Sequence, residues 1–213
     1  MTLSPIPFVL ALLCAFTIAA QTDFEGTITY NIKFQDKTGK MTDAQAASFM
    51  GMEQTYYLKG NHYKSVMDGH LKMTQYYTGK DTLYSTMAGV NALIYIDAKQ
   101  NKEKVISSNI TKGQEVVAGY PCDVLEIKTD KSTTTYYFSP EIRTNPEGYA
   151  NHNYGLWAYC LEQTKGALPL KTTITSAEMQ LSMEAKTVAA GPLEDTIFEL
   201  PKDLPLMKSP ENR

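Results

Sequence analysis

The sequence predicts a mainly β domain of the α+β class: an antiparallel meander of about ten to twelve strands with one or two short helices. Segment 24–35 alternates apolar and polar residues with the period of two that a half-exposed strand requires. Glycines then separate short segments rich in Tyr, Thr, Val, Ile and Met, at a spacing typical of consecutive hairpins. Only segments 41–52 and 145–166 interrupt this pattern, and both have the composition of a helix.

The first strand has one apolar face and one polar face. The residues at its polar positions are Thr, Asn, Lys, Gln and Glu, which suit contact with water. We expect the apolar face to be buried on the inner side of the sheet and the helix in 41–52 to cover it. This face consists of Ile28, Tyr30, Ile32 and Phe34, after Phe24.

The remaining strands are expected between the turn residues. The Asp68-Gly69 pair suits a tight hairpin, because glycine tolerates a positive φ angle. No linker, internal repeat or low-complexity run divides the chain, so residues 21–207 should form one domain, followed by a disordered tail at 208–213. The expected strands are 54–58, 62–67, 71–78, 82–87, 92–97, 104–111, 115–120, 122–129, 133–139, 169–176, 179–187 and 196–200.

Two helical segments are predicted from their start signals. Thr42 is followed three residues later by Gln45, the spacing of a capping box, and an alanine-rich stretch follows. In the second segment, Asn145-Pro146-Glu147 is a typical helix start and 155–161 is the apolar stretch.

Composition excludes several classes of protein. The 213 residues carry 20 Lys and Arg against 23 Asp and Glu, a net charge of −3, which excludes a nucleic-acid binder that relies on basic charge. Apolar residues at 43% and charged residues at 20% indicate a globular chain with a real core.

The first 20 residues have the pattern of a secretory signal peptide. They contain no charged side chain, and the apolar run 8–20 is too short to span a bilayer. It ends on Ala19 and Ala20, so we expect cleavage near Ala20 and a periplasmic or secreted protein without a membrane span in its mature part. Leu13 before Cys14 does not fit the lipid-attachment motif of a lipoprotein.

Two cysteines, Cys122 and Cys160, remain after the expected cleavage. In an exported chain, the simplest interpretation is one disulfide between them. Two buried thiols that never meet are the alternative.

The search for chemistry finds no catalytic centre. Among the motifs absent are HExxH, CxxC, GxSxG, the P-loop and the dinucleotide-binding glycines. The three histidines, His62, His70 and His152, are scattered and pair neither with each other nor with a cysteine. We therefore expect no enzyme, no metal site and no cofactor.

Methionine and tyrosine are unusually frequent, with 10 and 14 residues against a single Trp. Flexible, polarizable methionine side chains form adaptable apolar linings, so these residues are candidates for the wall of an apolar cavity. An ordinary β core has the same composition and remains the alternative. The candidate cavity residues are Ile28, Tyr30, Ile32, Phe34, Phe49, Met50, Met73, Tyr77, Met87, Met179 and Met183.

Several segments, taken together, resemble a family of uncharacterised Gram-negative envelope proteins related to the lipoprotein-carrier (LolA/LppX-like) superfamily. They are FEGTITY after the signal peptide, GYPCDVLEIKT at 119–129 and PLEDTIFELP at 192–201. YYFSPEIRTNP at 136–146 and GALPL at 166–170 also fit. Asp195, Phe198 and Pro201 match the acidic residue, Phe and Pro with which the family's final strands end.

The resemblance implies a curved antiparallel sheet, a half-barrel whose concave side is closed by the helices. In carriers of this shape the cavity accepts acyl chains, so the leading expectation is a soluble envelope protein that binds a lipid or a lipoprotein acyl chain. A ligand-free envelope scaffold, with its Tyr-rich strands as a partner surface, is the alternative. No nucleic-acid partner is expected, and the sequence does not predict the oligomeric state.

Overall fold

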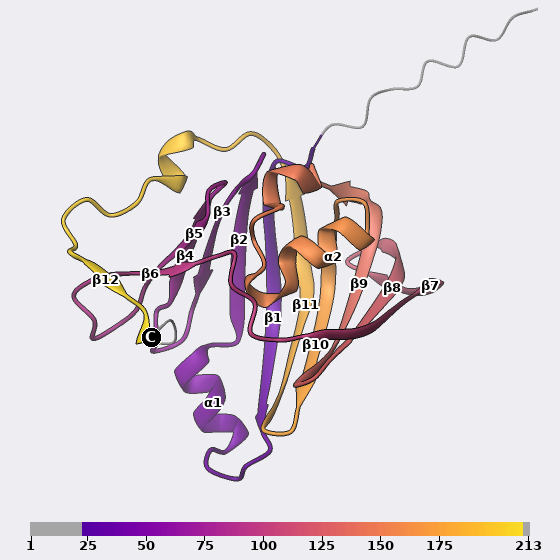
Figure 1. Cartoon of the computed structure of the whole chain (residues 1–213), viewed down its shortest axis with the longest axis horizontal. Coiled ribbons are helices and arrows are strands. Elements are labelled where there is room, and N and C mark those ends of the chain that lie inside the picture. The colour runs from indigo at the N-terminus through magenta and orange to yellow at the C-terminus, as the bar shows by residue number, and fades with distance from the viewer. Residues whose placement is uncertain (1–22, 211–213) are drawn as a thin grey trace, which may run out of the picture.

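A computed structural model describes residues 23–210, so the expected signal peptide lies outside the described residues. One 12-stranded sheet contains every described strand, and the sheet curves into an open half-barrel (Figure 1). The predicted fold class is therefore confirmed. The strands are β1 (Gly26–Asp36), β2 (Glu53–Lys59), β3 (His62–Met67), β4 (Thr74–Thr78), β5 (Thr82–Thr86), β6 (Leu93–Asp97), β7 (Val105–Val117), β8 (Tyr120–Thr129), β9 (Ser132–Arg143), β10 (Ala167–Ser176), β11 (Met179–Ala190) and β12 (Leu206–Lys208).

The strand order across the sheet is β12-β6-β5-β4-β3-β2-β1-β11-β10-β9-β8-β7. All neighbours are antiparallel except β12 and β6, which run parallel. Strand β1 lies at the centre because it pairs with β2 on one side and with β11 on the other. Strands β6 and β7 follow each other in the chain but lie towards opposite edges, so their connection must cross the concave side of the sheet.

Two expected strands differ from the observed ones. Segment 115–120 was expected to be separate, but β7 continues to Val117, because Gly113 (φ 61°) belongs to a register shift between Thr111 and Glu115 instead of a turn. Extra residues at such a shift bend a strand without ending it. Segment 196–200 forms a 3-10 turn, η3 (Asp195–Phe198), and not a strand.

The start of the expected disordered tail, residue 208, is placed too early, because ordered structure continues through Ser209. Lys208 belongs to β12, which pairs with β6. Ser209 is buried, and its backbone N–H donates to the carbonyl of Tyr95. Residues 211–213 lie outside the described part of the chain.

Helix α1 (Asp43–Met50) has the predicted start: Thr42 accepts from the Gln45 N–H, and the Gln45 side chain accepts from the Thr42 N–H. Its position differs in part from the expectation, since it lies beyond the end of β2 and beside only the second half of β1, and does not cover the whole apolar face of that strand (Figure 1). The reason is its narrow apolar surface, of which only Ala46 is fully buried.

The Asp68-Gly69 pair anchors α1 and does not form a tight hairpin. The Asp68 carboxylate accepts the backbone N–H groups of Met52 and Glu53 just after the helix, each at 2.9 Å. A side chain at Gly69 would collide with the backbone of Met50, so the loop requires glycine to pack against the helix end.

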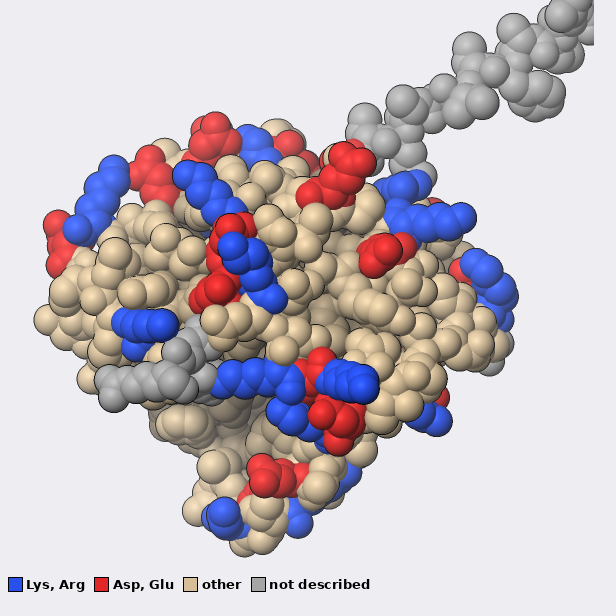
Figure 2. Space-filling view, in the orientation of Figure 1, with Lys and Arg blue, Asp and Glu red and all other residues tan. Residues whose placement is uncertain are grey.

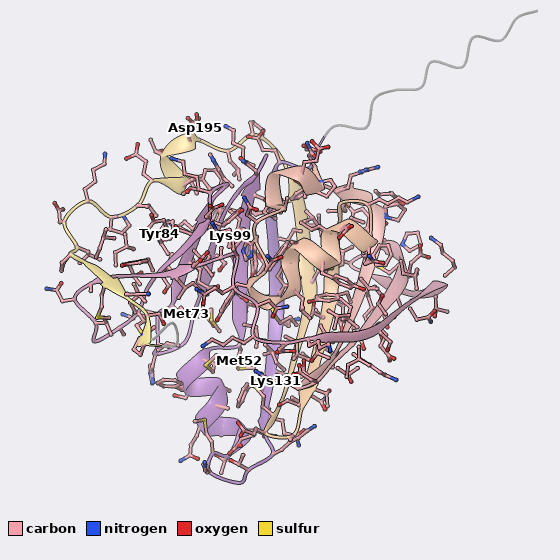
Figure 3. All side chains as sticks on the ribbon, viewed as in Figure 1. Met52, Met73, Tyr84, Lys99, Lys131 and Asp195 are labelled. Carbon is pink, nitrogen blue, oxygen red and sulfur yellow. The ribbon has the colours of Figure 1, made fainter. Side chains whose placement is uncertain are left out.

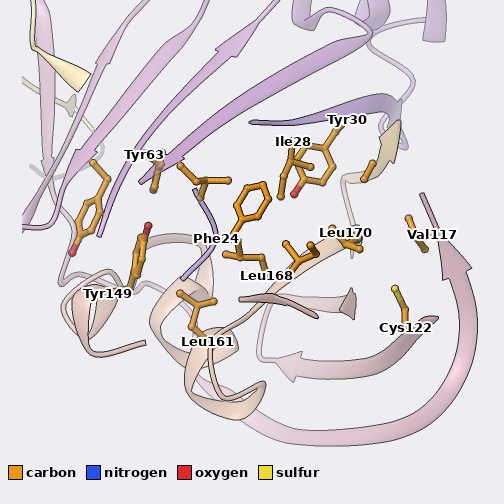
Figure 4. Close-up of a cluster of buried hydrophobic side chains, with 14 of the residues drawn as sticks. Phe24, Ile28, Tyr30, Tyr63, Val117, Cys122, Tyr149, Leu161, Leu168 and Leu170 are labelled. Atoms are coloured by element: carbon orange, nitrogen blue, oxygen red, sulfur yellow. The ribbon is translucent and has the colours of Figure 1, made fainter. Parts of the chain in front are cut away.

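The second helical segment covers the concave face. It consists of the 3-10 turns η1 (Pro146–Tyr149) and η2 (Tyr154–Leu156), followed by α2 (Trp157–Gln163). Figure 4 shows Tyr149 and Leu161 from this segment packed against side chains of the sheet. Fully buried Ile28, Leu168 and Leu170 belong to the same cluster, so this end of the half-barrel is filled.

Candidate functional site

The other end of the concave side holds a chamber of about 450 Å³. This volume falls within the range of about 300–1,000 Å³ that small-molecule sites occupy in proteins. Figure 2 shows the surface hollowed between α1, at the bottom of the view, and a band of charged side chains across the middle. The concave face is thus packed at one end and hollow at the other.

Aliphatic and methionine side chains from five elements and one loop line most of the chamber. Strands β1, β3, β10 and β11 contribute the walls, and Met50 contributes from the end of α1. Met73, the residue just before β4, also lines the chamber (Figure 3). Side chains of this kind adapt to the shape of an apolar ligand. The apolar lining residues outside the aromatic group are Ile32, Met50, Met67, Met73, Ile174, Leu181 and Met183, with Pro169.

A strap, residues 98–104, closes the front of the chamber. This connection between β6 and β7 passes in front of β1 (Figure 1), and four of its residues line the chamber: Gln100, Asn101, Lys102 and Glu103. At its start, the carbonyl of Ala98 accepts the backbone N–H groups of two residues in the second helical segment.

The far end of the strap is bound to the turn between β8 and β9. A single carboxylate oxygen of Glu103 accepts the hydroxyl groups of Thr129 at 2.6 Å and Ser132 at 2.7 Å. Lys104 donates its backbone N–H to the Asp130 carboxylate at 2.8 Å and accepts the Asp130 N–H at 3.1 Å. Both ends of the strap are thus attached by hydrogen bonds, and the segment between them forms the rim.

Aromatic side chains form the inner end of the chamber. The hydroxyl of Tyr30 donates to the carbonyl of Pro169 at 2.7 Å, and that of Tyr136 to the carbonyl of Gly155 at 3.2 Å. Burial raises the pKa of each phenol above the ordinary value for tyrosine, so both hydroxyl groups stay neutral and can donate. Trp157, the only tryptophan of the chain, stacks on Tyr63 in the same lining.

Polar side chains interrupt the apolar wall on β2, β3 and β4. The Gln54 amide donates to the hydroxyl of fully buried Ser65 at 3.2 Å. Tyr56 lies in the same cluster; burial raises its pKa to about 12, and hydrogen bonds with Ser65 and Gln54 oppose the rise. Gln75, opposite Ser65 on the next strand, also lines the chamber.

Of the candidate cavity residues, Tyr30, Ile32, Met50, Met73 and Met183 line the chamber. The other candidates do not line the chamber. Part of the inner face of the sheet is packed core, and α1 directs the Phe49 side chain towards solvent. Ile28 and Tyr77 are buried in the packed end, Phe34, Met87 and Met179 are half-buried outside the lining, and Phe49 is 47% exposed.

Sequence reasoning missed the strap and the polar cluster. Apart from Ala98, segment 98–104 contains only polar and charged residues, which predict a loop but not its path across the sheet. Gln54 and Gln75 occupy inward positions of their strands. A polar residue at an inward position was the one sequence signal that could have indicated the polar cluster.

The expected disulfide does not form in the structure. Cys122 and Cys160 are both free and buried. Cys122 packs in the cluster of Val117 and Leu170, whereas Cys160 on α2 packs in a second cluster with Leu125 and Phe138. The two thiols therefore face different neighbours and remain unpaired, as in the alternative interpretation of the sequence.

Neither a metal cluster nor a membrane helix is found in the described residues. No group of three or more His, Cys, Asp or Glu side chains in residues 23–210 could hold a metal ion. No helix in that part of the chain combines the length and the apolar character needed to cross a bilayer.

The family model described as a domain of unknown function, DUF4412, matches residues 24–204. This match spans the sheet from the start of β1 to the segment before β12. A comparison with curated proteins found no match.

Proposed function

The chain belongs to the DUF4412 family, whose function is unknown, and we propose that it is an exported envelope protein that binds an apolar ligand in its chamber. The ligand class is a lipid or an acyl chain. Binding, and no catalysis, is the assigned role.

The observation that carries this proposal is the chamber itself. Its lining combines four methionines, Met50, Met67, Met73 and Met183, with aliphatic residues, at the volume of a small-molecule site. A half-barrel that only served as a scaffold would gain stability by filling this space, because unfilled apolar volume costs contact energy.

Apolar burial alone is a sufficient driving force. Each methylene group moved from water into the chamber contributes about 0.8 kcal/mol, so several methylenes offset the cost of immobilising a chain. The methionines adjust to different chain positions, and the strap separates the bound chain from water.

Export is proposed from residues 1–20 alone, whose uncharged apolar run ends on two alanines. The relationship to lipoprotein carriers is likewise a proposal. It is supported by the resemblance of the quoted segments and agrees with the half-barrel shape.

Native mass spectrometry of the protein purified from its own cells tests the proposal. We expect a species heavier than the cleaved polypeptide, and organic extraction of that species should release a lipid or a fatty acyl compound. Folded protein that carries no such mass and takes up no added lipid would contradict the proposal and favour the scaffold.

A further inference from the structure

The two sides of the chamber differ in chemistry. On β1, β10 and β11 the lining is mostly aliphatic, with Ile32, Ile174, Leu181 and Met183, and Thr172 as a polar member. On β2, β3 and β4, glutamine, serine and tyrosine occupy inward positions. A chamber for a plain hydrocarbon would gain nothing from this second wall, since buried amides cost free energy when they lack partners.

Strand register brings the polar side chains together. Ser65 on β3 pairs with Tyr56 on β2 and with Gln75 on β4. Gln54 reaches Ser65 diagonally through its 3.2 Å hydrogen bond. Gln54 and Gln75 are thus two strands apart and offset by two residues along the sheet, with Ser65 on the strand between them.

Gln75 has hydrogen-bonding capacity left over. Its side-chain amide, half-buried and facing the chamber, makes no hydrogen bond to another residue of the described chain. An amide has two donor hydrogens and an acceptor oxygen, so a ligand could both donate to it and accept from it.

Charged side chains are confined to the rim. Asp97, Lys102 and Glu103 are the charged residues of the lining, and all lie at the end of β6 or on the strap. The lining residues of β2, β3 and β4 include no charged side chain, so this wall offers a carboxylate or ammonium no ion-pair partner of its own, and burying an unpaired charge is costly.

We infer that the chamber is built for an amphiphile whose chain carries an uncharged hydrogen-bonding group, such as an alcohol, ester or amide, and that Gln75, supported by Gln54, recognises this group. The chain lies along the aliphatic wall of β1, β10 and β11. This inference rests on the proposed function and names the ligand class of the same site.

The single tryptophan gives a direct test, since Trp157 lines the chamber and bromine quenches tryptophan fluorescence on contact. The wild-type protein is titrated with three probes of equal chain length: 12-bromododecan-1-ol, 1-bromododecane and 12-bromododecanoate. The same titrations are made with Gln75→Met, which keeps the side-chain length and removes the hydrogen bonds.

Gln35→Met is the matched control, because Gln35 lies on β1 and is exposed outside the chamber. We expect Gln75→Met to weaken binding of the alcohol by about 3- to 10-fold, the effect of one or two neutral hydrogen bonds. Binding of the bromoalkane should be unchanged or tighter, and Gln35→Met should change none of the three affinities.

The outcomes separate the inference from the proposed function. If no probe quenches Trp157 in the wild-type protein, the chamber does not bind apolar chains and both fail. If all probes bind but Gln75→Met changes the alcohol and the bromoalkane equally, or changes neither, the polar recognition is wrong and the apolar site stands. Preferred binding of the carboxylate, independent of Gln75, would also overturn the inference.

Discussion

The hydroxyl of Tyr63 lies 2.8 Å from Nε2 of His152, and this buried contact joins the wall of the chamber to the segment that covers it. Tyr63 lines the chamber from β3, whereas His152 is fully buried between η1 and η2. The other ring nitrogen of His152, Nδ1, has no hydrogen-bond partner in residues 23–210. An imidazole in this setting is stable only when it is neutral.

This burial predicts a loss of stability in mild acid. Desolvation lowers the pKa of His152 from 6.5 to about 4, so between these values the unfolded chain binds a proton that the folded chain does not. The free energy of unfolding should therefore fall by about 2–3 kcal/mol between pH 7.5 and pH 4.5. Urea unfolding at both pH values measures this difference.

His152→Gln should remove most of that pH dependence, because glutamine does not titrate. His70→Gln is the control, because it makes the same replacement at an exposed histidine in the loop that follows β3. An unchanged slope in His152→Gln would show that another group is responsible.

Neighbouring residues on α1 provide a second test of the chamber. Met50 lines it and Phe49 points to solvent, so Met50→Glu places a carboxylate inside the site while Phe49→Glu does not. We expect Met50→Glu to weaken binding of 12-bromododecan-1-ol by more than about tenfold, because the ligand would bury an unpaired charge. Equal effects of the two substitutions, measured by Trp157 quenching, would contradict the assignment of the lining.

The attachment of the strap to the β8–β9 turn should depend on Glu103. Replacing it with alanine removes the acceptor of the Thr129 and Ser132 hydroxyls, and we expect the protein to lose about 1–2 kcal/mol of unfolding free energy. Amide exchange in 98–104 should become faster. Lys131→Ala, an exposed position in the same turn, should stay within about 0.5 kcal/mol of the wild type; an equal loss in both variants would argue against the anchoring role.

Both core thiols should be unreactive in the folded protein. Burial raises the pKa of Cys122 and of Cys160, which suppresses the reactive thiolate. Peptide mapping after alkylation should find neither residue modified under native conditions and both modified in urea. A peptide pair joined through Cys122 and Cys160 would refute the free-thiol structure.

The strand pattern could be predicted from sequence because burial in a one-layer sheet repeats every second residue. Alternation over 24–35 is enough to place β1 and its inner face, and the Thr42–Gln45 pair is enough to start α1. Both features depend only on neighbours in the chain, so no knowledge of the tertiary fold is needed.

The chamber could be predicted only in part, because its boundary depends on contacts between distant segments. Ile28 and Ile32 have the same parity on one strand, yet α2 and its neighbours pack against the first and leave the second facing the cavity. The path of the strap is set by the strand order, which places β6 and β7 towards opposite edges. Local sequence does not encode either relationship.

The most direct test of the central claim is to identify which residues a bound chain touches. The wild-type protein is incubated with a dodecanol that carries a photoreactive group at its methyl end, irradiated, digested and mapped by mass spectrometry. The apolar-site proposal predicts labels in the chamber lining, on the peptides that contain Ile174, Leu181 and Met183. Labels confined to exposed apolar residues of β7, such as Ile106 and Val116, with none in the lining, would contradict it.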